Sequence, residues 1–326
     1  GLPPARTETE LEGKFMIRYI VKRLLLMIPA ILATSLIIFV AMNMTGGDPV
    51  DTLAPENATE EQIAQIRDEL GLNDPLLVRY LKYMGGMLHG DLGISYVTKQ
   101  DVFKTFAERL PATLKLACSS VFVATLVALP LGIYTAIHQN TWKDTGGMIF
   151  ALFGVSMPNL WLGLMLILGF SLHLKWFPSG GYGGIRNLVL PAVTVGLGFA
   201  ALIPRTARAA MLDVIRQDYM TTARAKGVPE RRVIFGHGLK NALIPIITVI
   251  GMQLSNALTG SVLAETVFSW PGVGRLIVDS IAKRDTPMVT GSIIMCCILV
   301  CFVNVVIDLI YAFFDPRIKA QYARKG

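Results

Sequence analysis

Charged residues are scarce in this sequence. They make up 16% of the 326 residues, whereas soluble domains carry about 25%. Hydrophobic residues reach 53%, and the mean hydropathy is +0.53. This balance argues against a soluble globular domain, and the abundance of aliphatic and aromatic residues excludes a disordered chain.

Histidine and cysteine are also few, and their arrangement excludes several kinds of site. The four cysteines lie in apolar segments without the spacing of a metal site, and the four histidines are isolated. The chain has no Gly-x-x-x-x-Gly-Lys-Ser/Thr phosphate loop, no His-Glu-x-x-His and no Gly-x-Ser-x-Gly. We therefore expect no enzymatic activity, no bound metal and no cofactor in this chain.

Long apolar segments dominate the sequence instead. A helix needs about 20 predominantly apolar residues to cross a bilayer. Six segments meet or approach this length, so the sequence predicts an all-α polytopic membrane protein with six transmembrane helices. The predicted spans are Leu24–Met44, Leu116–Ile137, Met148–Leu174, Leu188–Pro204, Leu243–Ala264 and Val289–Phe314.

The charged residues that remain predict the orientation of the chain. The loop between the fourth and fifth spans carries eight Lys and Arg residues against three Asp and Glu residues. Basic loops stay on the cytoplasmic side of the membrane. Both termini are then cytoplasmic, in a multi-pass protein of the bacterial plasma (inner) membrane. The net charge of +7 fits such loops, and no nucleic acid partner is expected.

The loop after the first span carries helix signals of its own. Thr59 and Gln62 have the spacing of a capping box, and apolar residues follow at helical intervals. Gly71 predicts the end of this helix, and Asp74-Pro75 predicts the start of another. We expect a small helical cap outside the membrane, which serves either as a folded connector or as a docking surface.

The inner loop from Asp218 to Pro245 predicts two helices joined by a tight turn. Its Ala-Arg-Ala-Lys run favours a helix, and Gly227 directly after it is well placed for a left-handed stop. Val228-Pro229 then begins a second helix, because proline is tolerated in the first turn. From charge alone, this basic hairpin either binds anionic lipid or transmits force to a partner.

This hairpin resembles the "EAA" coupling loop of ABC importer permeases. Tyr219 to Gly227 reads Tyr-Met-Thr-Thr-Ala-Arg-Ala-Lys-Gly, similar to the peptide and nickel branch, although Thr221 and Thr222 replace the Glu and first Ala of the general pattern. Further stretches resemble the same branch: Gly47–Val50, Gly90–Ser95, Ser156–Trp161, Trp176–Gly184, Asn241, Pro245, Glu265–Arg275, Arg284-Asp285 and Asp315–Arg317. The resemblance covers roughly Met16 to Lys319 and indicates the first permease subunit of a dipeptide, oligopeptide or nickel importer.

The resemblance implies an ABC type I importer permease fold with a cytoplasmic coupling helix. It implies a homologous second permease, two ABC ATPase subunits, an extracytoplasmic substrate-binding protein and membrane lipid as partners. ATP and Mg²⁺ would be bound by the ATPases. The coupling helix would enter a groove on an ATPase, with small residues at close contacts and cations paired with acidic groups. The residues with this implied role are Thr222, Ala223, Arg224, Ala225, Lys226, Gly227 and Arg231.

The cargo is not encoded in these motifs. Di- and oligopeptides are expected because peptide systems are the larger share of the branch, and nickel or a metal chelate is the alternative. An alternative of another class is an ion-coupled secondary transporter, which predicts paired midplane carboxylates and inverted repeats. Only Asp308 is available for such a role, and it lies near one end of its span.

The translocation path would run between this chain and the second permease. Polar residues within the apolar segments are candidates to line it, although hydrogen bonding between helices is the alternative role for each. Pro158 predicts a kink in the third span, where Ser156 can bond a freed carbonyl. Trp270 belongs either to an outer gate or to an interface anchor. The path or gate candidates are Ser156, Pro158, Asn159, Trp161, Ser255, Asn256, Glu265 and Trp270.

Three charged residues near the membrane have predicted roles as well. Asp308 is expected to be hydrogen-bonded near the inner interface, with Asn304 one turn away. Arg205 and Arg208 follow the fourth span, and they either bind lipid phosphates or extend the coupling helix.

The predicted organisation has four parts. Residues 1–15 form an N-terminal tail, native or added, because they lack an apolar pattern and precede a natural start at Met16. Residues 16–44 form the first transmembrane helix, and residues 45–110 form the extracytoplasmic helical loop. Residues 111–326 form a five-helix permease core with the coupling loop at 205–242.

Overall fold

The computed structural model describes residues 8–44, 50, 53–55 and 58–314, without the side chains of 8–20, 23–24 and 311–314. Most of Gly47–Val50 and all of Asp315–Arg317 therefore lie outside the described residues. Within them, helices predominate and the one β-bridge pairs Ile94 with Asp101.

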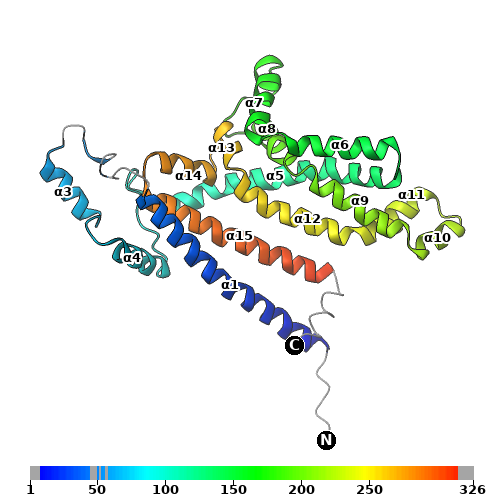
Figure 1. The fold of residues 1–326 in the computed structure, drawn as a ribbon, viewed down its shortest axis with the longest axis horizontal. Coiled ribbons are helices and arrows are strands. Elements are labelled where there is room, and N and C mark those ends of the chain that lie inside the picture. Colours follow the sequence, from blue (N-terminus) through cyan, green and yellow to red (C-terminus); the bar gives the residue numbers. More distant parts are fainter. Residues whose placement is uncertain (1–7, 45–49, 51–52, 56–57, 315–326) are drawn as a thin grey trace, which may run out of the picture. The chain divides into compact units, whose positions relative to one another are not determined.

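Figure 1 shows the helices in chain order. They are α1 (Glu8–Met44), α3 (Glu60–Glu69), α4 (Leu76–Leu88), α5 (Val102–Ile137), α6 (Trp142–Ser156), α7 (Asn159–Leu166), η1 (Ile167–His173), α8 (Ile185–Leu197), α9 (Leu202–Ile215), α10 (Asp218–Ala225), α11 (Glu230–Arg232), η2 (Val233–Gly238), α12 (Leu239–Gly260), α13 (Val262–Val267), α14 (Val273–Ala282) and α15 (Thr286–Phe314). The elements η1 and η2 are π-helices.

The first helix starts earlier than the sequence predicts. It begins at Glu8 and not at Met16, so part of the predicted tail is helical. The segment Leu25–Met44 within this helix has the length and apolarity of a membrane span.

Six spans were predicted, the third with a kink at Pro158, and two of them are broken. Among the described residues, four helical segments could each cross a membrane alone: Leu25–Met44, Val102–Ile137, Glu230–Gly260 and Thr286–Ile310. Two bent pairs bring the number to six if each counts as one span. The predicted third span bends by 95° between α6 and α7–η1, and the fourth bends by 59° between α8 and α9.

The break in the third span follows from Pro158. A proline disfavours the α conformation at the residue before it, and Met157 is extended, with φ −84° and ψ 128°. Pro158 itself is extended, with ψ 130°, so the helix stops completely. The Ser156 hydroxyl donates to the Leu152 carbonyl at 2.9 Å, within α6. Pro158 lacks the N–H that would bond the Gly154 carbonyl, so Ser156 does not make the predicted bond to a carbonyl freed by the proline. The predicted kink is therefore a full break.

The break in the fourth span lies at residues 198–201, just before α9. Pro204 stands in the first turn of α9 and has no N–H to donate to the carbonyl four residues earlier. Residues 188–204 consequently contain the end of one helix and the start of the next.

The chain divides into two compact units. The core unit contains Leu114–Trp270 together with the chain ends before Ile17 and from Val303. The cap unit contains Ile17–Thr113 and Pro271–Phe302.

In the core unit, α5, α9 and α12 pack around one buried cluster, and α9 runs alongside α12 (Figure 1). The cluster comprises Ile133, Ala136, Ala207, Ala210, Met211, Ile234, Ala242 and Ile246. Gly132 permits the close approach of α5 to α9, because a Cβ there would lie 2.6 Å from the Pro204 carbonyl oxygen and 2.7 Å from the Ala207 Cβ.

A buried ion pair joins α6 to α9. Nε and Nη2 of Arg208 donate to the two carboxylate oxygens of Asp144 at 2.7 and 2.6 Å, and Asp144 is 6% exposed. The Asn140 N–H also donates to this carboxylate, at 3.1 Å. Arg208 was predicted to bind lipid phosphate or to extend the coupling helix. The sequence did not predict this ion pair, whose carboxylate lies 64 residues away in sequence and takes up Nε and Nη2 of Arg208.

In the cap unit, the predicted helices of the outer loop are present. The Thr59 side chain accepts a hydrogen bond from the Gln62 N–H, and the Gln62 side chain accepts one from the Thr59 N–H. This confirms the predicted capping box at the start of α3. Gly71 has φ +63° after α3, as the predicted stop requires. Tyr80 of α4 hydrogen-bonds Ser35 of α1 at 2.9 Å, and its ring lies 5.5 Å from that of Phe39. The α4 helix is thereby tied to α1.

Asp285 ties a second loop to the start of α15. Its carboxylate accepts hydrogen bonds from the Ser95 hydroxyl and from the Tyr96 N–H, the latter at 3.0 Å. This side chain is 3% exposed. Leu92, Val102 and Met288 form a buried apolar cluster in the same unit.

Gly132→Ala should destabilise the core unit by about 1–3 kcal/mol, because the added methyl cannot be accommodated against the α9 backbone. Thermal unfolding of the purified protein measures this as a lower Tm. Gly146→Ala is the matched control, since a Cβ at that α6 position meets nothing within 4 Å. Equal Tm values for the two variants would contradict the close packing.

Asp144→Leu should lower the stability by about 3 kcal/mol, since it leaves the Arg208 charge largely desolvated and unpaired. Combining it with Arg208→Met should recover much of that loss, because neither charge then remains. The coupling between the two changes is read from the Tm values of the single and double variants. Strictly additive losses would show that the pair does not act as a unit.

Candidate functional site

The hairpin of the core unit is the first candidate site. Helix α10 ends at Ala225, and Gly227 takes φ +74° with its N–H donating to the Arg224 carbonyl at 2.9 Å. Pro229 then precedes α11, which continues through η2 into α12. The predicted helix, glycine turn and second helix are confirmed. The structure adds that the second arm runs without interruption from Glu230 to Gly260.

The predicted coupling residues are all gathered on this hairpin. Ala223 and Arg224 are half-buried, and the others are exposed. The Thr222 hydroxyl donates to the Asp218 carbonyl at 3.0 Å, so this side chain bonds back to the backbone of the first turn of α10. A groove on a partner could therefore receive the tip of the hairpin without unpacking its base. The exposed members are Thr222, Ala225, Lys226, Gly227 and Arg231.

Arg224 has a partner within the hairpin. Its Nη2 lies 2.9 Å from Oε1 of Glu230, and its Nε also donates to that carboxylate. The side chains of Arg224 and Glu230 are 36% and 56% exposed, so the pair contributes at most about 1 kcal/mol. An acidic group on another protein can replace Glu230 at little cost. The sequence-based account paired Arg224 only with a partner protein and missed this contact six residues away.

The base of the hairpin is fixed by buried apolar contacts and by one exposed hydrogen bond. Met220 is fully buried, and a Cβ on Gly238 of η2 would lie 3.1 Å from its Cε. Asn241 donates from Nδ2 to the Tyr219 hydroxyl at 3.0 Å. Ile234 joins the buried cluster of α5, α9 and α12. The hairpin is thus held at its base and exposed at its tip.

A second candidate region surrounds α13. Glu265 is fully buried and accepts a hydrogen bond from the Ser261 hydroxyl at 3.2 Å. The Trp270 N–H donates to the Glu265 carbonyl at 2.8 Å, and the Trp270 side chain is also fully buried. Complete burial argues against the interface-anchor alternative for Trp270. A gate role for this segment stays a prediction.

A glycine-rich loop covers α13. The Gly181 N–H donates to the Phe268 carbonyl at 2.8 Å, and a Cβ on Gly180 would lie only 2.4 Å from that oxygen. The Tyr182 ring packs edge-on against Trp270 at 4.9 Å, and Nζ of Lys115 lies 5.5 Å from the Tyr182 ring centre. The sequence-based account missed Lys115 and Tyr182. The Gly-Gly-Tyr-Gly-Gly run was the available signal for a close backbone approach.

The remaining path candidates lie at two other places. Ser255 donates to Oδ1 of Asn304 at 2.7 Å, so it serves contact between α12 and the end of α15. Asn256 is exposed and donates to Gln253 at 2.9 Å. Asp308 is half-buried one turn beyond Asn304.

The α6–α7 break carries Ser156, Pro158, Asn159 and Trp161, and Trp161 is 49% exposed. A Cβ on Gly198 would lie 3.4 Å from Oδ1 of Asn159, so the two helix breaks are neighbours. The candidates thus occupy separate places within the core unit. No group of three or more His, Cys, Asp and Glu side chains suited to a metal occurs among the described residues.

Comparison with known proteins gives matches over nearly the whole chain. Residues 128–320 match the family "Binding-protein-dependent transport system inner membrane component", and residues 16–117 match its N-terminal family. The glutathione transport system permease protein GsiC of Escherichia coli K12 is 38% identical over 304 residues, covering 93% of this chain and 99% of that protein. GsiC of Salmonella paratyphi A is equally similar, at 38% identity.

Among solved structures, the fold is similar to that of a chain of the MetNI methionine ABC transporter in an inward-facing conformation. The TM-score is 0.57 at 18% identity, and the match covers 65% of this chain and 97% of that chain. A second crystal form of MetNI gives 0.55 at 20% identity. The predicted all-α ABC type I importer permease fold is confirmed. The chain belongs to the binding-protein-dependent transport system inner membrane components, the multi-pass permease subunits of ABC importers.

Proposed function

We propose that this permease forms half of a translocation path for short peptides, delivered by an extracytoplasmic binding protein. The observation that carries the proposal is the hairpin around Gly227, which is exposed at its tip and fixed at its base. A homologous second permease supplies the other half of the path. Two ABC ATPase subunits bind ATP and Mg²⁺ and receive the hairpins.

The hairpin lies on the cytoplasmic side in this proposal, with both termini. Its excess of basic residues supports that orientation. The α3–α4 region then lies on the extracytoplasmic side, where a binding protein arrives.

The second arm of the hairpin gives a physical route for coupling. From Glu230 to Gly260 the chain is helical over 31 residues, which corresponds to about 46 Å at 1.5 Å per residue. A displacement of the hairpin by the closing ATPases therefore moves the inner end of a continuous helix. Transport follows if this motion biases an equilibrium between outward-open and inward-open states.

Short peptides are the proposed cargo, with glutathione, a tripeptide, as the first candidate. The GsiC relatives are named for glutathione transport and are 38% identical over nearly their whole length. Nickel or a metal chelate is the second candidate, because selectivity can reside in the binding protein. Membership in the family of ABC importer permeases argues against the ion-coupled secondary transporter.

The turn at the tip is the first target for mutation. Gly227→Pro cannot adopt φ +74° and loses the N–H bond to Arg224, so it should abolish ATP-dependent uptake while the protein still reaches the membrane. Gly227→Asn should retain most uptake, because asparagine tolerates the left-handed conformation. Uptake into proteoliposomes measures both. Normal uptake by Gly227→Pro would contradict the coupling role.

Ala223→Glu is an independent test, because it adds bulk and negative charge to a half-buried position of the tip. We expect at least a tenfold loss of uptake and weaker co-purification of the ATPases. Glu230→Gln is the matched control, since it removes only an exposed ion pair and should leave uptake within about twofold. Similar losses in both variants would point to general damage to the hairpin.

The cargo is identified by measuring ATP hydrolysis by the complete complex in lipid. Its binding protein is presented with glutathione, with dipeptides and tripeptides, and with nickel alone or with a chelator. Stimulation by peptides would support the proposal. Stimulation only by metal would show that the cargo is a metal and would leave the proposed importer mechanism unchanged.

A further inference from the structure

Helix α4 of the cap unit carries more apolar surface than the described residues cover. Its 13 residues include two basic side chains and no Asp or Glu. Leu77, Leu81 and Leu88 are 64%, 60% and 80% exposed. At 3.6 residues per turn these three positions fall within about 40° of one another around the helix axis. They form one exposed apolar row, here called the leucine stripe, and such a row is typical of an interaction surface.

The neighbouring flank of α4 packs on α1. The Tyr80 hydroxyl hydrogen-bonds Ser35 at 2.9 Å, and the Tyr80 and Tyr83 rings lie 5.5 and 6.2 Å from the Phe39 ring. Met84 is buried, and by helical geometry it lies between Tyr80 and the leucine stripe. No charged position separates the covered flank from the exposed stripe. The apolar surface therefore continues around α4 beyond the part that α1 covers.

This flank meets α1 within the segment that could span a membrane. Ser35 and Phe39 belong to Leu25–Met44. They lie nine and five residues before its end, or about 14 and 8 Å at 1.5 Å per residue. Leu36, next to Ser35, is exposed as well. Acyl chains surround such a segment in a bilayer, so they also reach the stripe beside it, whereas a protein that docks from water stays outside this depth.

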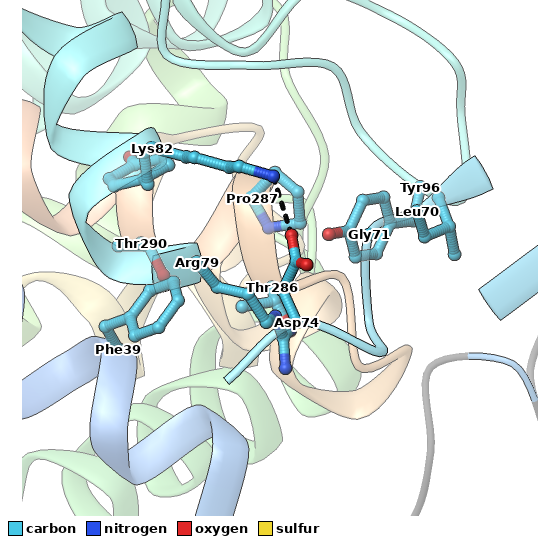
Figure 2. A pocket seen from close by; sticks show the side chains of 11 residues that line it. Phe39, Leu70, Gly71, Asp74, Arg79, Lys82, Tyr96, Thr286, Pro287 and Thr290 are labelled. Carbon is cyan, nitrogen blue, oxygen red and sulfur yellow. Dashed lines mark hydrogen bonds and ion pairs between the residues drawn. The ribbon is translucent and has the colours of Figure 1, made fainter. Parts of the chain in front are cut away.

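The charged residues of α4 lie away from the leucine stripe. Arg79 and Lys82 are at least about 100° from each of its leucines around the helix axis. Figure 2 shows Lys82 reaching to Asp74, with Nζ and Oδ2 2.6 Å apart, beside a hollow of about 150 Å³. A helix with one apolar side and basic residues opposite is typical of a membrane surface. Tyr80 and Tyr83 fit the same place, because tyrosine is enriched at membrane–water interfaces.

We propose that α4 lies in the lipid bilayer beside α1, as an interfacial helix whose leucine stripe contacts acyl chains. Arg79 and Lys82 then lie on the side of the headgroups and water. The α3 helix has no buried residue and carries four acidic ones, so it stays outside the bilayer. The leaflet is the outer one in the proposed orientation of the chain, and only this choice of leaflet rests on the proposed function.

A photoreactive amino acid in the leucine stripe tests the contact with lipid. The variants Leu77→p-benzoylphenylalanine and Leu81→p-benzoylphenylalanine are placed in the full-length protein, in its complex with the binding protein. The complex is irradiated in nanodiscs of phosphatidylethanolamine and phosphatidylglycerol, and mass spectrometry identifies what each position has captured. Glu61→p-benzoylphenylalanine is the control, because Glu61 is an exposed position of α3.

We expect phospholipid adducts at positions 77 and 81, and at least tenfold fewer at position 61. Adducts with the binding protein or with a second permease in place of lipid would overturn the proposal. Equal lipid labelling at the three positions would do the same. The adducts need neither ATP nor cargo, so they report on α4 whether or not the chain transports peptides.

Stability in the nanodisc is a second measurement. Leu81→Asp should lower the Tm by at least about 2 °C, because it places a charge among acyl chains. Leu81→Trp should leave the Tm nearly unchanged, since tryptophan is favoured at membrane interfaces. Glu61→Lys changes the charge of an exposed α3 position and should also leave it unchanged.

Two results of this measurement would contradict the lipid contact. A wild-type Tm for Leu81→Asp would place the stripe in water, where an exposed polar substitution is nearly neutral. An equal loss in Leu81→Trp would show that close packing against protein, and not lipid, surrounds the stripe.

Discussion

Backbone hydrogen bonding in apolar surroundings is the constraint on which this structure depends. In a bilayer, peptide groups must be satisfied within the protein, so the long apolar segments form helices. The two predicted spans that break do so at Met157-Pro158 and at residues 198–201. Asn159 and Gly198 place these breaks beside each other, and Ser156 bonds a carbonyl of the preceding turn. The interruptions of these two predicted spans are therefore neighbours within the core unit.

The hairpin and α12 differ in how firmly their parts are held. Its inner end grows out of the hairpin through a π-helix, and its sides pack on α5 and α9. The Gly227 turn and the Arg224–Glu230 pair remain exposed at the tip, where their contacts are weak. A partner can thus exchange contacts at the tip, while the buried base carries any displacement into the helix. A loop with weak contacts at its base would absorb the same displacement.

Local signals explain why much of the candidate site could be predicted from the sequence. The capping box of Thr59, the stop at Gly71 and the turn at Gly227 each depend on residues within one turn of the chain. The fourth span was predicted as continuous and the third with only a kink, because hydropathy reports length and apolarity and contains no information on bend angle. The ion pair of Arg208 was not predicted because its partner lies 64 residues away, on another helix.

The sequence by itself determined the helical class, the apolar segments, the hairpin with its left-handed turn and the family resemblance. These follow from side-chain chemistry and backbone sterics over a few consecutive residues. Only the tertiary structure decided that Asp144 meets Arg208 and that Trp270 is buried against Tyr182. Such contacts depend on how helices far apart in sequence pack, because the position of each side chain is set by the elements against which its own helix packs.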